Sequence, residues 1–263
     1  MTDMRLQIVN DLHLDHPGSG GAPPLAKGVR MVVVAGDTCE GLVNAVEQLR
    51  RAYPAPTEVV MVAGNHELWS KNLDFEEHWE EGLLAAERHG VHLLENSALT
   101  LWGVRLLGCT LWTDYELFGA HMRDVAMHAA AHTMLDHRRI KWRRDPWRRF
   151  RPAEARLLHH RSRLFLETEL AKSHDGPTVC ISHHAMTPEA VAPAFRDSMV
   201  TAAYASELSS LIDRFQPDLI VSGHTHYPMD LTRGRTRLLS NPAGYPGESR
   251  SFDPAFVVEL PDP

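Results

Sequence analysis

Five short blocks of the sequence carry side chains that can bind a divalent metal ion or move a proton. They are Asp11-Leu12-His13, Gly36-Asp37, Gly64-Asn65-His66-Glu67, Ser182-His183-His184 and Gly223-His224-Thr225-His226. Carboxylate oxygens, imidazole nitrogens and amide oxygens are common ligands of such ions. In the first and last blocks the two donors lie two residues apart, so an extended backbone points both to the same side. One such block arises by chance, but five in one chain predict a metal centre.

Each block follows a short apolar run of the kind that forms a strand buried on both faces. The runs are 6–9, 31–34, 59–62, 178–181 and 219–221. Helical patterns lie among them at 42–52, 75–89 and 202–215. Strands that alternate with helices indicate an α/β fold, in which ligands bind beyond the carboxyl ends of the strands. We therefore expect the five blocks to meet at one edge of a sheet.

The rest of the sequence predicts a second sheet and a helical insert. Further strands are expected in the middle and C-terminal parts of the chain, at 104–109, 237–240 and 256–260. From 114 to 172 the alternation stops, and helical patterns at 121–135 and 153–172 flank a segment rich in Arg and Trp. We expect an α/β two-sheet sandwich flanked by helices, with the insert at about 114–172, as one domain of residues 1–263.

The order of the five blocks resembles that of the calcineurin-like metallophosphoesterases, whose blocks read D-x-H, G-D, G-N-H-[DE], H and G-H-x-H. The resemblance runs from Asp11 to His226 and so covers nearly the whole chain. It implies two divalent metal ions that share Asp37. The implied ligands of one ion are Asp11, His13, Asp37 and His226, and those of the other are Asp37, Asn65, His183 and His224.

The same resemblance implies that Asn65 and His66 contact the substrate and that His66 protonates the leaving group. His183 is taken as the ligand because it is the first His after its strand, and an exchange of roles with His184 stays open. His184 is also a candidate substrate contact. Tyr245, in the turn Asn241-Pro242-Ala243-Gly244-Tyr245, is another, because a similar turn occurs in bacterial members of the family.

The implied reaction is hydrolysis of a phosphate ester by a hydroxide that bridges the two ions. Two divalent ions minus the charges of Asp11 and Asp37 leave a site that attracts an anionic phosphate. A bound metal lowers the pKa of water from 15.7 towards ~7, so hydroxide exists at neutral pH. The blocks contain no candidate covalent nucleophile, which favours direct attack. Mixed nitrogen and oxygen donors suit Mn, Fe or Zn, and the sequence does not choose among them.

The sequence differs from the Ser/Thr protein phosphatases of the family at a position that bears on the type of substrate. Those relatives carry an arginine just after the second block, whereas Thr38-Cys39-Glu40-Gly41 follows Asp37 here. This difference counts against a dedicated phosphoprotein phosphatase. The family resemblance implies a phosphodiesterase acting on nucleotide-type substrates, with a phosphomonoesterase or Ser/Thr-type phosphatase as the alternative and a small phosphate ester as the partner in either case. The sequence leaves the oligomeric state open.

A second class of function rests on a basic segment. The chain has 263 residues and a net charge of −7, yet residues 138–163 carry 11 Lys and Arg against two acids, together with Trp142, Trp147 and Phe150. Such a segment could bind nucleic acid through phosphate contacts and base stacking, or form a protein-binding module. We favour a solvated insert whose arginines pair with acidic groups elsewhere.

The sequence also predicts a location. Three cysteines are too few for a disulfide framework in a chain of this length, which indicates a reducing compartment. We see no apolar run long enough for a membrane helix, and the start shows no signal-peptide pattern. We therefore expect a cytoplasmic protein that does not bind membranes.

Overall fold

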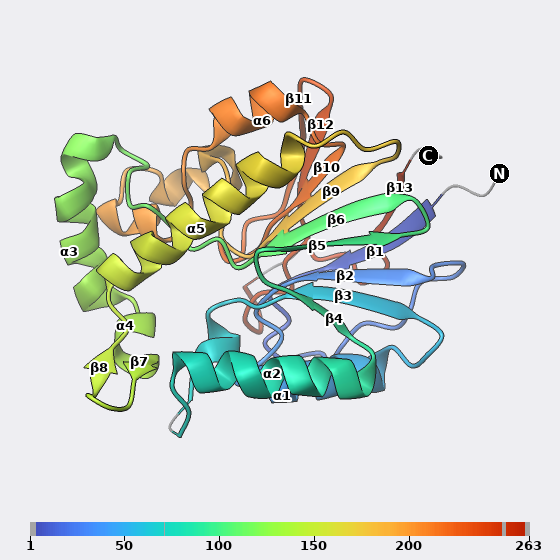
Figure 1. Cartoon of the computed structure of the whole chain (residues 1–263), viewed down its shortest axis with the longest axis horizontal. Coiled ribbons are helices and arrows are strands. Elements are labelled where there is room, and N and C mark those ends of the chain that lie inside the picture. The colour runs from blue at the N-terminus through green and yellow to red at the C-terminus, as the bar shows by residue number, and fades with distance from the viewer. Residues whose placement is uncertain (1–3, 71, 249–250, 261–263) are drawn as a thin grey trace.

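The computed structural model describes residues 4–70, 72–248 and 251–260 and shows two β-sheets packed face to face (Figure 1). The first sheet has the order β13 (Val257–Leu260), β1 (Met4–Val9), β2 (Met31–Ala35), β3 (Glu58–Val62), β4 (His92–Leu94). The second has the order β11 (Met229–Arg233), β12 (Thr236–Ser240), β10 (Leu219–Val221), β9 (Thr178–Ser182), β6 (Val104–Cys109), β5 (Ser97–Leu101). Neighbours are parallel except at β13–β1, β11–β12 and β5–β6, which are antiparallel.

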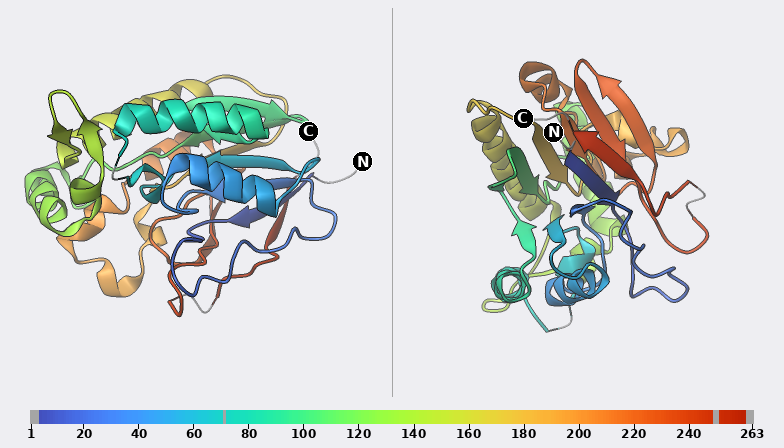
Figure 2. Two further views of the ribbon diagram at one scale, coloured as in Figure 1. Left: turned by 90° about the horizontal axis from the view of Figure 1, so that it is seen from below. Right: turned by 90° about the vertical axis from the view of Figure 1, so that its right-hand side faces the viewer.

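Helices cover both outer faces and one end of the sandwich. On the first sheet, α1 (Leu42–Ala52) and α2 (Phe75–His89) run side by side (Figure 2). On the second sheet lie α5 (Pro152–Leu170) and α6 (Ser209–Phe215). At the end opposite the two termini lie α3 (Arg123–Thr133), α4 (Asp136–Arg139) and a hairpin of β7 (Lys141–Arg143) and β8 (Arg148–Arg149). None of the described helices is long and apolar enough to cross a membrane.

The strands are buried on both faces, which explains their continuous apolar runs. Ile8 and Val33 pack between the sheets, in one cluster with Ile181 and Val221 of the second sheet. Their neighbour Val32 faces the other way, into a cluster with the apolar side of α1. Because both directions meet apolar partners, alternation of polar and apolar residues is absent from these strands.

The structure confirms the predicted α/β sandwich of two sheets flanked by helices. It also corrects two details. The helix expected at 202–215 is wrong: a 3₁₀ turn (Met199–Ala203) and α6 are separated, because Ala185 exchanges backbone hydrogen bonds with Tyr204 and Ser206. The strand expected at 256–260 joins the first sheet instead of the second, since β13 pairs with β1.

Candidate metal centre

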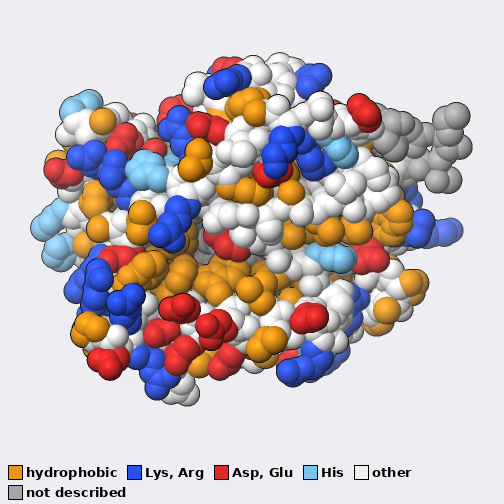
Figure 3. Space-filling model, in the orientation of Figure 1, with side chains coloured by type: hydrophobic (Ala, Val, Ile, Leu, Met, Phe, Trp, Pro, Cys, Tyr) orange, Lys and Arg blue, Asp and Glu red, His pale blue; other side chains and the backbone are white. Residues whose placement is uncertain are grey.

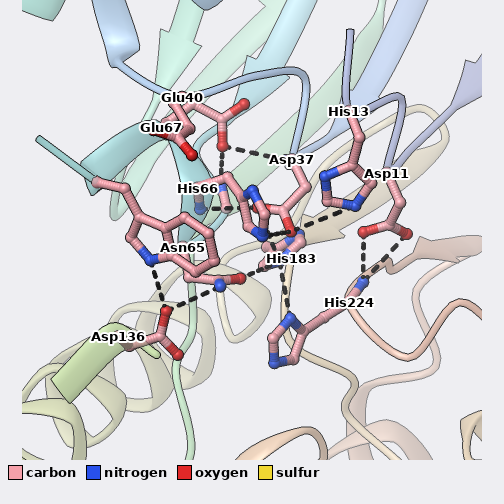
Figure 4. A network of polar contacts seen from close by, with 12 residues as sticks. Asp11, His13, Asp37, Glu40, Asn65, His66, Glu67, Asp136, His183 and His224 are labelled. Carbon is pink, nitrogen blue, oxygen red and sulfur yellow. Dashed lines mark hydrogen bonds and ion pairs between the residues drawn. The ribbon is translucent and has the colours of Figure 1, made fainter. Parts of the chain in front are cut away.

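The five blocks meet where the carboxyl ends of the two sheets adjoin (Figure 4). Asp11 and His13 follow β1, Asp37 follows β2, Asn65 and His66 follow β3, His183 follows β9, and His224 and His226 follow β10. Parallel strands place their carboxyl ends at one edge, which is why residues more than two hundred positions apart come together here.

The backbone at these strand ends adopts an uncommon conformation. Asp11, His13, Asp37, His224 and His226 have φ values of 53°, 43°, 53°, 67° and 50°. Non-glycine residues rarely occupy this left-handed region, and such strain clusters at functional sites. The surrounding structure therefore holds the strand exits in a conformation that local preference alone opposes.

One cluster of possible metal ligands consists of Asp11, His13, Asp37 and His226, whose donor atoms lie within 4.8 Å of one another. The Nε2 atoms of His13 and His226 are 3.0 Å apart. His226 Nε2 is also 3.7 Å from an oxygen of Asp11, and His13 Nε2 is 3.9 Å from Oδ2 of Asp37. Two imidazole nitrogens and two carboxylates thus converge on one point.

A second cluster consists of Asp37, His183 and His224. His183 Nε2 lies 3.0 Å from Oδ1 of Asn65, 3.2 Å from Nδ1 of His224 and 3.4 Å from Oδ1 of Asp37. The other ring nitrogen of His183 is 2.9 Å from the carbonyl oxygen of Ala35. A proton on Nδ1 satisfies that carbonyl and leaves Nε2 free to bind a metal.

The donor set fits divalent metal ions. Asp11 and Asp37 are almost fully buried, and buried carboxylates need a positive partner. Burial lowers the pKa of His13 to about 4, so its imidazole is neutral and able to coordinate. The ring nitrogens that face the clusters are Nε2 of His13 and Nδ1 of His224. The opposite nitrogens of these two rings are buried without a hydrogen-bond partner in the described part of the chain.

Asp37 belongs to both clusters. Its Oδ2 lies on the side of His13, and its Oδ1 lies on the side of His183. Burial raises the pKa of this carboxyl, but the nearby His183 and His66 more than offset that effect and hold the pKa well below its usual range. Asp37 therefore carries negative charge between the two clusters.

His66 lies beside Asp37 but outside both clusters. Its Nε2 is 3.8 Å from Oδ2 of Asp37 and 3.2 Å from the hydroxyl of Tyr245. Its ring stacks on Trp69, with 3.6 Å between ring centroids, and its backbone N–H donates to Oδ1 of Asp37. Tyr245 in turn stacks on His13 at 4.4 Å. His66 and Tyr245 thus form one wall of the site.

His184 points away from the clusters. Its Nδ1 lies 3.1 Å from the carbonyl oxygen of Thr110, and its ring contacts Trp112 and His224. His183, not its neighbour, carries the nitrogen that faces Asp37. His184 is 1% exposed and is not among the described residues that line the cleft reported below, so its contact with a substrate stays a prediction.

The sequence analysis assigned no role to three carboxylates that support the site, Glu67, Asp136 and Glu248. Glu67 is fully buried and accepts backbone N–H groups from Asp37, Thr38 and Gly64 at 3.0, 2.6 and 2.7 Å. It therefore ties the loops after β2 and β3 together. Its place directly after His66 in the third block was a signal that could have revealed it.

Asp136, at the start of α4, orients Asn65. Its Oδ1 accepts the side-chain N–H groups of Asn65 at 2.9 Å and of Trp69 at 2.8 Å. Figure 4 shows Asp136 on one side of Asn65 and His183 on the other. Because the amide nitrogen of Asn65 is held by Asp136, its oxygen must face His183. No sequence motif near Asp136 indicates this role.

Glu248 supports His226 from the outer side. His226 Nδ1 donates to its carboxylate at 2.7 Å, and the backbone N–H of Tyr245 donates to the same oxygen at 3.0 Å. A carboxylate on the far nitrogen of a ligand histidine fixes the ring and increases its basicity. Only the folded loop after β12 brings Glu248 to this position.

A cleft of about 370 Å³ opens beside the clusters. Its lining includes Asp37, Asn65, His66, His224 and Tyr245, together with several apolar side chains. Among its described lining residues none is Lys or Arg.

At least five of the 11 Lys and Arg side chains of the basic segment 138–163 form ion pairs. The pairs are Arg139–Glu40, Arg144–Glu77, Arg148–Glu154, Arg156–Glu116 and Arg163–Glu167. Phe150 is fully buried, and Trp142 packs against it and Phe75. On the face in Figure 3, Lys and Arg alternate with Asp and Glu over this end of the molecule. These contacts agree with a solvated insert more than with a nucleic-acid surface.

Comparison with known proteins gives a family match and a fold match. The family model for calcineurin-like phosphoesterases matches residues 4–228. No curated protein sequence matches the chain. Among solved structures, the phosphopantetheinyl hydrolase of Mycobacterium tuberculosis is 20% identical to this chain, with a TM-score of 0.70. The matched region covers 95% of this chain and 94% of the hydrolase chain. GAP50, the anchor in the inner membrane complex of Plasmodium, is 12% identical to this chain, with a TM-score of 0.48. The matched region covers 93% of this chain and 73% of the GAP50 chain.

Proposed function

We propose a specific reaction for this chain, which belongs to the calcineurin-like phosphoesterase family and is a metal-dependent phosphoester hydrolase. The proposal is that it is a phosphodiesterase with two divalent ions that acts on nucleotide-type substrates. The observation that supports a two-ion hydrolase is Asp37, whose two carboxylate oxygens face different clusters. One ion would bind Asp11, His13, Asp37 and His226, and the other Asp37, Asn65, His183 and His224.

When bound, Mn, Fe or Zn ions supply positive charge for the phosphate oxygens and lower the pKa of water towards ~7. Asp37 fixes the position of both sites because its carboxylate is buried and hydrogen-bonded by His66 N–H. Glu67 holds the backbone on either side of this carboxylate. The protein thus prepares the site before the substrate arrives.

His66 is the proposed proton donor to the leaving group. Its ring is held between Trp69 and the hydroxyl of Tyr245, and it lines the cleft beside Asp37. In the proposal its Nε2–H contacts a phosphate oxygen and passes its proton to the departing oxygen, while Asn65 and Tyr245 contact the substrate at the same wall. A positioned acid of this kind contributes ~10²–10⁴-fold to rate.

The charge of the cleft supports a diester over a monoester. A phosphodiester carries one negative charge at neutral pH, whereas a monoester carries nearly two. The described lining residues include Asp136 and Glu248 but no Lys or Arg. Since all positive charge must come from the metal site, the less charged substrate is the better match.

The test compares two reporters of one leaving group on Mn-loaded protein, bis(p-nitrophenyl) phosphate and p-nitrophenyl phosphate. We expect the higher kcat/KM for the diester, and no turnover of either by the Asp37→Ala variant. A preference for the monoester would replace the proposal by a phosphomonoesterase. If both ions stay bound and neither reporter is hydrolysed, the result would contradict an enzymatic function and favour a nucleic-acid- or protein-binding role.

A further inference from the structure

Two separate segments contribute apolar side chains to the cleft, which together are called the apolar wall. Met134 and Leu135 come from the junction of α3 and α4, inside the expected insert. Val191, Phe195 and Val200 come from the loop between β9 and α6. These side chains line the same cleft as Asp37 and His66, so a molecule held by its phosphate at the metal centre extends towards them.

Two members of this wall are unusually exposed. Phe195 is 64% exposed and Leu135 is 47% exposed, although both line a concave site. Large apolar side chains left open to water inside a cleft mark a surface that a ligand covers.

The wall is held in place by its own hydrogen bonds. The carbonyl oxygen of Phe195 accepts Oγ1–H of Thr201 at 2.5 Å and N–H of Ser198 at 3.1 Å. The carbonyl oxygen of Val191 accepts Nε–H of Arg196 at 3.1 Å. The apolar surface is therefore preformed, and a ligand that packs on it loses little free energy in ordering the loop.

We propose, on the basis of the function proposed above, that a group esterified to the substrate's phosphate, such as a nucleoside, packs an uncharged, apolar face against Leu135 and Phe195. A charged group at this wall would lose water without gaining a partner among the apolar side chains. The basic segment 138–163 contributes no Lys or Arg to the described lining of the cleft.

Alkylphosphonates test the wall without requiring a reaction. They carry one organic group on a phosphonate that cannot be hydrolysed. Calorimetric titration of the Mn-loaded protein would measure affinity for methyl-, propyl- and pentylphosphonate. Each methylene should tighten binding by roughly two- to fourfold if it leaves water at the wall. 4-Phosphonobutyrate, which ends in a carboxylate, should bind more weakly than pentylphosphonate.

Variants locate the effect. Phe195→Ala and Leu135→Ala should each reduce the ratio of pentyl to methyl affinity, by roughly tenfold for the larger ring. Leu164→Ala is the matched control, because Leu164 is also 64% exposed but lies on α5 and does not line the cleft. Leu135→Lys should improve binding of 4-phosphonobutyrate, since it places a cation at the wall.

The outcomes separate this proposal from the function on which it rests. Metal-dependent binding of methylphosphonate with no gain from longer chains would overturn the apolar wall and leave the phosphodiesterase intact. Equal affinity for 4-phosphonobutyrate and pentylphosphonate would overturn the proposal that the group at the wall is uncharged. Failure of all phosphonates to bind, with both ions present and both reporters left intact, would overturn the proposed function itself.

Discussion

The two ligand clusters share Asp37 but are supported in different ways. In the second cluster, His183 is held by the backbone carbonyl of Ala35, and Asn65 is held by the 3% exposed Asp136. In the first cluster, His226 is held by Glu248, whose side chain is 46% exposed. One set of supports is buried, and the other is open to solvent.

This difference has a consequence for metal binding. A backbone carbonyl has little freedom to move, and a buried carboxylate is screened weakly by water and salt. An exposed carboxylate is screened more and must order a mobile side chain. We therefore expect the second cluster to retain its ion at lower free metal concentration than the first.

The largest effect should come from removing the residue common to both clusters. Asp37→Ala should lower kcat/KM by at least ~1,000-fold, because each metal contributes several kcal/mol of transition-state stabilisation. Metal analysis after gel filtration should find both ions reduced. Asp124→Ala, which removes an exposed carboxylate on α3, is the control and should leave both quantities unchanged. Retention of two ions by Asp37→Ala would refute its shared role.

His66 belongs to neither cluster, so its replacement should separate chemistry from metal content. His66→Ala should lower kcat by ~10²–10⁴-fold through loss of a positioned acid. The metal content should stay near that of the parent protein. If metal is lost as well, His66 is a ligand and the two-cluster description is incomplete.

The supports themselves give a smaller and asymmetric effect. Asp136→Ala should weaken the second site and Glu248→Ala the first, each by ~10–100-fold in metal affinity. Titration of the metal-free protein with Mn resolves the two sites. Asp136→Asn keeps an oxygen that accepts from Asn65 and Trp69, so it should recover most of the loss. Identical two-site curves for the two Ala variants would contradict the comparison.

The smallest effect is a pH dependence that lies outside both clusters. His78 on α2 is 3% exposed, and burial lowers its pKa to about 4. The unfolded chain binds a proton at this side chain near pH 6.5, so stability is complete above that value and falls as the pH drops towards 4. His78→Leu should remove about 2–3 kcal/mol of that acid-induced loss.

Urea unfolding of metal-free protein at pH 7.5 and pH 4 measures the effect, with the exposed His132→Leu as control. Because no ion is present, protonation of the ligand histidines cannot be mistaken for release of metal. An unchanged pH dependence in His78→Leu would refute the contribution of His78 to the acid sensitivity.

The sequence by itself determined the chemistry and the architecture that carries it. A strand buried on both faces needs a continuous apolar run, and a polar residue after such a run must lie at the strand's end. Parallel strands bring those ends to one edge, so Asp11, Asp37 and His183 could be expected to meet before any coordinates existed. The helices at 42–52 and 75–89 followed from the same local patterns.

Only the tertiary structure decided how the site is supported and what faces it. Asp136 and Asn65 are 71 positions apart, and their hydrogen bond depends on how the α3–α4 junction packs. The same holds for Glu248 on His226, for β13 beside β1, and for Phe195 at the cleft. Local sequence patterns record the periodicity of a strand or helix, but contacts between loops depend on packing of the whole chain, which no local pattern encodes.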